Sequence, residues 1–358
     1  MLNWLLLHLT KYYTNKLAAF RHQSKQMDKK INWGIIGLGK IANKFAADLQ
    51  LSENSVLYAV ASRNEEKAKF FSEQYNATNY YASYEELADD PEIDIIYVAT
   101  PHVFHFENTM MCLRKGKGVL CEKPMGMDYR EVERMVREAK ARNLFLMEGI
   151  WTRFIPATKK LVEILIRKTI GEVLFIRADF GFKADANREG RLYNKKLGGG
   201  SLLDVGIYPI YLSLLAAGIP IDIKVMARMT DTAVDGYCSM LFDYENGAKA
   251  ILESTIEADT PTEAYIYGSK GSLKLHSRFH HSEKITISKN GEEKVLDIKY
   301  KGNGYIHEIE EVTQCLLNRE TESSKLPLTS SMDVIKLIDR IKKEIGLQYE
   351  TETNRDLK

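Results

Sequence analysis

Two segments of the 358-residue chain carry side chains that can move protons. Lys123 directly follows a predicted buried strand, so its ammonium would lie at the carboxyl edge of a sheet, where ligands bind in open α/β folds. Asp204 and Tyr208 are four residues apart after three glycines, which places a carboxylate and a phenol on one face of a helix that Ser201 would cap. Taken alone, these residues favour the plainer interpretation of a solvated lysine, a surface aspartate and a buried tyrosine.

A glycine-rich turn offers a site for a pyrophosphate. Residues 37–42 read GLGKIA, a GxGxxA pattern between a predicted strand and a predicted helix. Gly37 permits the tight turn, Gly39 lets the backbone approach the anion, and Ala42 keeps helix and strand close. Lys40 and Ile41 open the helix, whose N-terminus faces the anion. The alternative is that the glycines merely form a turn.

The end of the next strand indicates which dinucleotide is bound. An NAD site usually has Asp or Glu there, whereas this chain has Ser62 and Arg63. A hydroxyl and a guanidinium can hold a 2′-phosphate through charge-assisted hydrogen bonds, so NADP is favoured over NAD, and S-adenosylmethionine is disfavoured. In the plainer alternative, Ser62 caps the following helix and Arg63 is a solvated surface residue.

The hydrophobic pattern predicts the elements that position these residues. Short β-branched runs alternate with helical stretches in the first half, which is typical of βαβ units with a sheet covered on both faces. The predicted strands are 31–38, 56–61, 93–99, 119–121 and 144–147, and the predicted helices are 41–49, 65–75, 104–114 and 128–142.

After Gly171 the pattern changes to longer alternating segments separated by turn signals, followed by two helices at 304–317 and 330–345. The predicted strands are 172–182, 221–229, 236–243, 248–254, 263–267, 272–275 and 284–288. The predicted fold is an α/β Rossmann domain at 27–150 followed by an α+β domain at 151–358 with a large, mostly antiparallel open sheet.

Composition narrows the possible partners. Fifty Lys and Arg against 49 Asp and Glu leave a formal charge of +1, which predicts a small-molecule substrate and no binding to nucleic acid. The four cysteines show neither a disulfide pattern nor zinc spacing, so no metal site is expected and a reducing cytoplasm is favoured. No stretch reaches eighteen apolar residues, so no membrane partner is expected.

Residues 1–26 form a separate N-terminal extension. Their apolar residues approximate helical spacing, which would allow an amphipathic helix on a membrane or partner. The favoured interpretation is a dispensable extension, with translation starting at Met27.

Several segments together resemble the glucose-fructose oxidoreductase / inositol dehydrogenase (Gfo/Idh/MocA) family, from residue 31 to about 349. The matching segments are GIIGLGKIA at 34–42, AVASR at 59–63, ATPHVFH at 99–105, CEKPM at 121–125, MEGIWTRFIPA at 147–157 and GGGSLLDVGIYPI at 198–210. The segments MEGIWTRF and LLDVGIY are most similar to the branch that contains dimeric dihydrodiol dehydrogenase and NADP-linked D-xylose dehydrogenase.

The resemblance implies hydride transfer between NADP, or NAD, and a sugar, polyol, diol or related carbonyl compound. It also implies that Lys123 and Tyr208 form the acid/base pair. Lys123 would polarise the substrate oxygen and favour the phenolate form of Tyr208, because a nearby ammonium lowers a phenol pKa. Asp204 would orient Lys123 or bond a substrate hydroxyl.

Further contacts are expected around this pair. Trp151 and Arg153 would line the substrate pocket, although interdomain packing explains them equally well. His102 is expected near the nicotinamide, whereas His105 would cap a helix. Thr100, Pro101 and Glu122 complete the expected cofactor contacts at the strand ends.

Two other functions stay open. Relatives with this fold include dinucleotide-binding regulators without catalysis, and dinucleotide-dependent glycosidases. Retention of both Lys123 and Tyr208 argues against a regulator. The resemblance, together with the need to cover one face of the open sheet, predicts a homodimer through the second domain.

Overall fold

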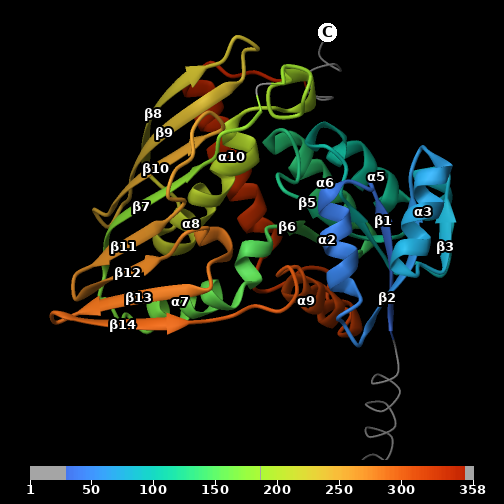
Figure 1. Cartoon of the computed structure of the whole chain (residues 1–358), viewed down its shortest axis with the longest axis horizontal. Helices are drawn as coiled ribbons and strands as arrows, with labels where there is room; N and C mark the ends of the chain where they lie inside the picture. The colour runs from blue at the N-terminus through green and yellow to red at the C-terminus, as the bar shows by residue number, and fades with distance from the viewer. Residues whose placement is uncertain (1–29, 186, 351–358) are drawn as a thin grey trace, which may run out of the picture.

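The computed structural model describes residues 30–185 and 187–350, so the predictions for residues 1–26 lie outside the described residues. Figure 1 shows two sheets with helices packed between and around them. The first sheet is wholly parallel, with strand order β3-β2-β1-β4-β5-β6. Its strands are β1 (Ile31–Ile36), β2 (Ser55–Ala61), β3 (Asn79–Tyr81), β4 (Ile95–Val98), β5 (Gly118–Glu122) and β6 (Leu146–Gly149).

Local side chains define the helices that cover this sheet. They are α2 (Lys40–Leu49), α3 (Glu65–Tyr75), α4 (Tyr84–Asp89), α5 (His105–Arg114) and α6 (Tyr129–Arg142). Asn64, Ser83 and Asp128 each accept a backbone N–H from the first turn of the helix that follows, in α3, α4 and α6 respectively. Strand order reverses between β1 and β4, and this is where open α/β sheets form their ligand crevice.

The second sheet has eight strands in the order β14-β13-β12-β11-β7-β10-β9-β8. Among its described strands only the neighbours β7 and β10 are parallel; the other neighbours are antiparallel. The strands are β7 (Val173–Gly181), β8 (Asp222–Met229), β9 (Asp235–Asp243), β10 (Lys249–Thr255), β11 (Ala264–Gly268), β12 (Gly271–Leu275), β13 (Lys284–Lys289) and β14 (Glu292–Asp297).

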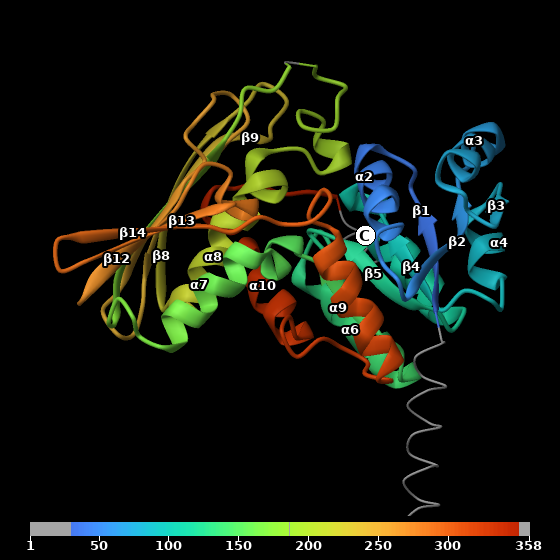
Figure 2. The same cartoon turned by 60° about the horizontal axis from the view of Figure 1, so that its bottom comes forward.

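Helices cover one face of this sheet and join it to the first. Figure 2 shows α7 (Pro156–Ile166), α8 (Ile207–Ala217) and α10 (Leu328–Glu344) between the large sheet and the parallel one. Helix α10 contacts β8 of the large sheet and also α6 and β6 of the first. Helix α9 (Ile306–Leu317) packs on α2 and β1. The predicted fold class is confirmed, while β3, α4, α7 and β14 are elements that the sequence pattern did not indicate.

One helical stretch of the described chain has the length and hydropathy of a membrane span. The helical stretch Lys195–Ala217 is long and apolar enough to cross a membrane, with a mean hydropathy of 1.4 in its most apolar window. However, 78% of that window is buried inside the protein, because α8 packs against β7 and β10. This stretch is therefore the central core helix of the second half.

Candidate active site

Lys123 and Tyr208 meet where the two sheets face each other. Lys123 follows the last residue of β5, and its Nζ donates to the backbone carbonyl of Asp204 over 2.7 Å. The same ammonium lies 5.0 Å from the centroid of the Tyr208 ring. Trp151 donates its Nε1–H to the Tyr208 hydroxyl over 3.2 Å. A cation, a phenol and an indole N–H donor thus come from three distant segments of the chain and lie close together in one buried site.

The electrostatics of the pair depend on burial as well as on charge. Burial raises the pKa of Tyr208 above its ordinary value, and the Lys123 ammonium opposes that rise. For Lys123, burial lowers the pKa, but the nearby Tyr208, Asp204 and Glu122 outweigh it and the net pKa is raised. The site therefore holds an ammonium beside a neutral phenol at neutral pH.

Asp204 acts through two different groups. Its backbone carbonyl accepts from Lys123, while its carboxylate lies 2.8 Å from Arg191 Nη1 and 3.9 Å from Lys123 Nζ. Burial alone would raise the pKa of Asp204. The positive charges of Lys123 and Arg191 have the larger effect, so the net pKa lies below its usual value. Asp204 is therefore ionised, and its carbonyl oxygen, not its carboxylate, makes the short contact that orients Lys123.

The turn that presents Asp204 is π-helical and spans Leu202–Gly206. Ser201 does not cap it, contrary to expectation, because its hydroxyl donates to the buried Asp235 carboxylate over 2.7 Å. Gly200 has φ +116°, and a Cβ there would lie 2.2 Å from Asp235 Oδ1. The turn is thus anchored to the second sheet through Asp235, with Tyr208 on the first turn of α8.

The two histidines after β4 have separate positions. His105 is the first residue of α5, and its backbone N–H caps the end of the short 3-10 helix His102–Phe104, whereas its ring nitrogens lie 2.7 Å from the carbonyl oxygens of Pro124 and Thr100. His102 is buried beside the site, and its Nδ1 has no hydrogen-bond partner among the described residues. Burial, with His105, Arg191 and Lys123 adding to it, holds the pKa of His102 well below its usual range, so the ring is neutral.

The glycine turn leaves room for a pyrophosphate. Gly37 has φ +83°, and a Cβ there would lie 2.6 Å from the backbone of Thr100. Gly39 precedes α2 with no side-chain cap, and a Cβ there would meet nothing within 4 Å. Ala42 is fully buried against the sheet, whereas Lys40 and Ile41 are exposed. These observations fit a dinucleotide lying over the N-terminus of α2.

The end of β2 also leaves a place for a charged group. Ser62 does not cap α3, because Asn64 does so by accepting the Lys67 N–H over 2.9 Å. The Ser62 hydroxyl instead accepts the Asn64 N–H over 3.2 Å, and Arg63 is exposed beside it. The guanidinium is thus available to an anion at this strand end.

Glu122 is more enclosed than a simple cofactor contact requires. The Tyr97 hydroxyl donates to its Oε1, and the Lys123 backbone N–H donates to its Oε2 over 3.2 Å. Burial raises the pKa of Glu122, with Lys123 lowering it in part. Thr100 and Pro101 lie at the neighbouring end of β4, where the Thr100 hydroxyl accepts from Asn108 over 3.1 Å.

The expected substrate walls are only partly at the site. The Trp151 ring stacks on Tyr305 at 4.6 Å and on His281 at 5.1 Å between centroids, so it supports Tyr208 instead of presenting a free face. Arg153 points elsewhere, because its Nε donates to the Lys325 carbonyl over 2.8 Å. A place for Arg153 in the substrate pocket stays a prediction, with its Nε already engaged by this carbonyl.

Sequence reasoning missed Arg191, Phe180 and His280. Arg191 comes from the loop before the three glycines and pairs with Asp204. His280 is 8% exposed, and its ring lies 4.9 Å from Tyr208 and 4.3 Å from Phe180. Its Nδ1 has no hydrogen-bond partner among the described residues. The consecutive histidines 280 and 281, which lie in a short 3-10 helix after β12, could have drawn attention to this segment.

Comparison with known proteins gives matches along most of the chain. Residues 31–150 match the profile of the GFO/IDH/MocA oxidoreductase family with an NAD-binding Rossmann fold, and residues 158–274 match the GFO/IDH/MocA C-terminal domain. The chain is 37% identical over 329 residues to trans-1,2-dihydrobenzene-1,2-diol dehydrogenase of Xenopus tropicalis, covering 88% of this chain and 98% of the relative. The Homo sapiens protein of that name is 34% identical over 330 residues, covering 89% and 98%.

Solved structures share the fold. The 3-ketoreductase KijD10 from Actinomadura kijaniata, in complex with NADP and TDP-benzene, has a TM-score of 0.79 and 26% identity over 88% of this chain and 98% of its own. An aldose-aldose oxidoreductase from Caulobacter crescentus complexed with glycerol has a TM-score of 0.82 at 24% identity, covering 89% and 98%. The latter likeness concerns the fold alone.

Proposed function

This chain belongs to the GFO/IDH/MocA oxidoreductase family, and we propose that it transfers a hydride between NADP and a diol, sugar or related carbonyl compound, with Lys123 and Tyr208 as its acid/base pair. The observation that carries the assignment is the buried contact between the Lys123 ammonium and the Tyr208 ring at 5.0 Å. This contact lies at the carboxyl edge of the parallel sheet, which is also the edge where the turn at Gly37 follows β1.

The cofactor would extend along the crevice between β1 and β4. NADP, when bound, supplies or accepts the hydride at nicotinamide C4. Residues 37–42 would hold its pyrophosphate, and Ser62 with Arg63 would hold its 2′-phosphate. The nicotinamide end would lie near a group of residues at the ends of β4 and β5, namely Thr100, Pro101, His102, Glu122 and Lys123.

Proton transfer would centre on Tyr208. During reduction of a carbonyl, the neutral phenol would donate its proton to the oxygen that gains negative charge as hydride reaches the carbon. During oxidation, Tyr208 would first lose its own proton to solvent, and the resulting phenolate, stabilised by the ammonium, would accept the hydroxyl proton. The Lys123 ammonium stabilises both the phenolate and the developing alkoxide, and Asp204 fixes that ammonium through its carbonyl oxygen.

The substrate would occupy the space beside these groups. Arg191 and Asp204 offer a donor and an acceptor for neighbouring hydroxyls, while Phe180 and His280 add an aromatic wall. The relatives are named for trans-1,2-dihydrobenzene-1,2-diol, which combines adjacent hydroxyls with an unsaturated six-membered ring. This pairing supports a cyclic diol or a sugar as the substrate class.

A panel assay tests the proposal. Purified protein is mixed with NADP⁺ and either trans-1,2-dihydrobenzene-1,2-diol or aldoses such as D-xylose, and NADPH is followed by its absorbance. Net NADPH formation is expected with at least one compound. Cofactor binding without turnover across the panel would support a regulator instead. Release of sugar from a glycoside without net NADPH would support a glycosidase.

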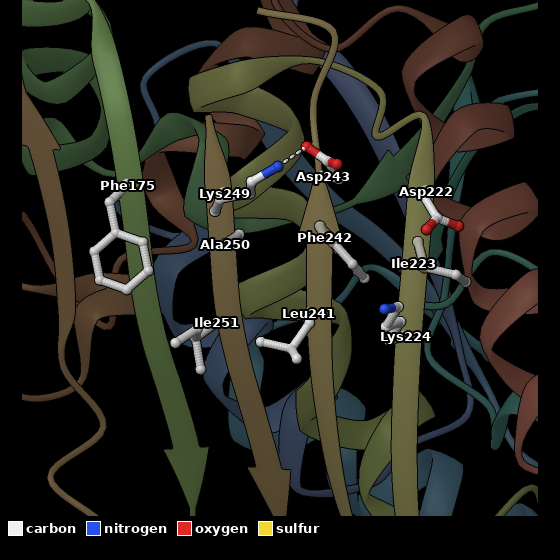
Figure 3. Close-up of a pocket in the computed structure, with 10 residues that line it drawn as sticks. All are labelled: Phe175, Asp222, Ile223, Lys224, Leu241, Phe242, Asp243, Lys249, Ala250 and Ile251. Carbon is white, nitrogen blue, oxygen red and sulfur yellow. Dashed lines mark hydrogen bonds and ion pairs between the residues drawn. The ribbon is translucent and has the colours of Figure 1, made fainter. Parts of the chain in front are cut away.

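The open face of the large sheet would form a homodimer. One row of directly paired residues crosses four neighbouring strands on the face away from the helices. The row consists of Lys224, Leu241, Ile251 and Arg177. Figure 3 shows a hollow on β7 to β10, of about 470 Å³, where Leu241 and Ile251 lie side by side. Leu241 is 48% exposed, and Met226 on the same face is 78% exposed. Apolar side chains on an uncovered sheet favour a second copy as the cover.

The proposed location is the cytoplasm. All four cysteines are free and buried, and no disulfide joins them. Burial raises the pKa of the Cys112 thiol well above its usual value, which disfavours the reactive thiolate. A protein that keeps every thiol reduced and enclosed suits a reducing compartment.

A further inference from the structure

A buried carboxylate lies directly behind the loop that carries Lys123. Glu148, in β6, is 3% exposed, and its Oε1 accepts the backbone N–H of Met125 over 2.8 Å. Met125 is two residues after Lys123, so this bond holds the loop on the C-terminal side of the lysine. An unpaired buried N–H would be costly, which makes the bond a strong constraint on the backbone there.

Other buried side chains hold the loop farther along. Glu131 accepts the Met127 N–H over 2.8 Å, and Lys342 of α10 donates to the Met127 carbonyl over 2.6 Å. These contacts lie four residues from Lys123. Among the described side chains that accept a loop N–H after Lys123, Glu148 is therefore the nearest to the lysine.

The surroundings of Glu148 make its charge sensitive to pH. Burial raises its pKa to about 7, with Ser331 of α10, the Met125 N–H and Lys123 lowering it and Glu122 raising it. Cys121 and Tyr211 also face Glu148, and burial raises the pKa of each, so both stay neutral. The second oxygen, Oε2, has no hydrogen-bond partner among the described residues.

We propose that Glu148 is a positioning residue: by accepting the Met125 N–H it fixes the loop that holds the Lys123 ammonium beside Asp204 and Tyr208, and its ionised form makes the stronger hydrogen bond. The inference rests on the proposed function of Lys123. An ionised carboxylate is the stronger acceptor, and its charge also favours the neighbouring ammonium. Hydride transfer should therefore quicken as pH rises through 7.

Single-turnover hydride transfer from trans-1,2-dihydrobenzene-1,2-diol, or from the aldose that proves active, to bound NADP⁺ tests this between pH 5.5 and 8.5. Glu148→Gln keeps an acceptor but cannot ionise, so its rate should stay at the wild-type acidic plateau without a step near 7. Glu148→Ala should be slower by about tenfold or more at alkaline pH, the effect of losing a buried hydrogen bond. Affinity for NADP should change little in both.

Two further variants separate positioning from general damage. Ser331→Ala removes a group that lowers the pKa of Glu148, so the step should move to higher pH while the alkaline plateau stays. Glu131→Gln alters the matched carboxylate at Met127 and should keep the step in place. The buried Asp235 has a pKa raised to about 6, and any step that it causes should persist in Glu148→Gln.

A readout without cofactor or substrate makes the outcome independent of activity. Above neutral pH, amide hydrogen exchange at Met125 should be fastest in Glu148→Ala and intermediate in Glu148→Gln, which keeps only a neutral and weaker acceptor. Unchanged exchange in Glu148→Ala, or an intact step near 7 in Glu148→Gln, would overturn the inference. If no variant and no wild-type protein transfers hydride across the panel, the proposed function fails, while the exchange result still decides whether Glu148 holds the loop.

Discussion

Replacing Lys123 by methionine removes the charge beside Tyr208 while keeping a long apolar side chain. The ammonium lies 5.0 Å from the phenol ring, and both groups are buried. At an effective dielectric constant of about 20, a unit charge at about 5 Å is worth ~3 kcal/mol to the phenolate. Because ~1.4 kcal/mol is a factor of ten in rate, Lys123→Met should slow the proton-coupled step by about a hundredfold.

Single-turnover hydride transfer with saturating NADP⁺ and an active diol or aldose measures this loss directly. Tyr208→Phe should lose about a hundred- to ten-thousandfold, the usual range for a general acid or base. NADP⁺ affinity in titration calorimetry should change little in both variants. The double variant should lose much less than the product of the single losses, because the lysine acts mainly through the phenol and the shared substrate oxygen.

Tyr211→Phe is the matched control, since Tyr211 is a buried tyrosine of the same helix and faces Glu148 instead of Lys123. It should keep near-normal hydride transfer. Full activity of Lys123→Met, or a double variant with strictly additive losses, would refute the coupled pair and restore the regulator or separate-role interpretations.

The remaining predictions concern cofactor choice, assembly and pH. Arg63→Ala should weaken NADP binding by about 1.5 to 3 kcal/mol in calorimetry and leave NAD binding nearly unchanged; equal losses would contradict the 2′-phosphate assignment. Light scattering at micromolar concentration should give twice the chain mass of 40.9 kDa, and Leu241→Asp should give the monomer; a monomeric wild type would contradict the proposed sheet interface. The folded pKa of Glu148 is about 7 against an ordinary 4.5, so the folded protein keeps a proton that the unfolded chain releases between these values. Stability should therefore fall as pH rises through this window, by about 1.4 kcal/mol per pH unit, and urea titrations of Glu148→Gln should lack that slope.

The parallel sheet and its ligand edge could be predicted because their signals are local. A fully buried strand such as β4 reads as an unbroken apolar run, and the turn at Gly37 needs a residue that tolerates positive φ. Strands as short as β3, with three residues, give no usable period, which explains why it was missed. The edge strand β14 was missed because most of its residues are exposed and charged or polar.

The chemistry of the site was less predictable where side chains have competing partners. Ser201 looks like a helix cap, but a buried Asp235 carboxylate from β9 takes its hydroxyl. The His105 backbone does cap a short 3-10 helix, but its ring lies between two carbonyl oxygens from separate segments, which the sequence did not indicate. Arg191 and His280 reach Asp204 and Tyr208 from loops, and no sequence spacing encodes that approach. Tertiary contacts decide each of these cases.

The pairing of Lys123 with Asp204 makes catalysis depend on how the two halves of the chain dock. Lys123 belongs to the parallel sheet, whereas its carbonyl partner belongs to a turn anchored on the large sheet. The C-terminal part of the chain returns to secure this docking: the Asp48 carboxylate of α2 accepts the N–H groups of Asn303 and Ile306 over 2.8 and 3.1 Å. Helix α10 packs on β8 of the large sheet and also contacts β6, the strand that carries Glu148. The same helix therefore connects the large sheet to the residue that holds the Lys123 loop. A small shift between the halves would therefore change the short Lys123 contact before it disturbed either core, since packed cores resist deformation more than single contacts do.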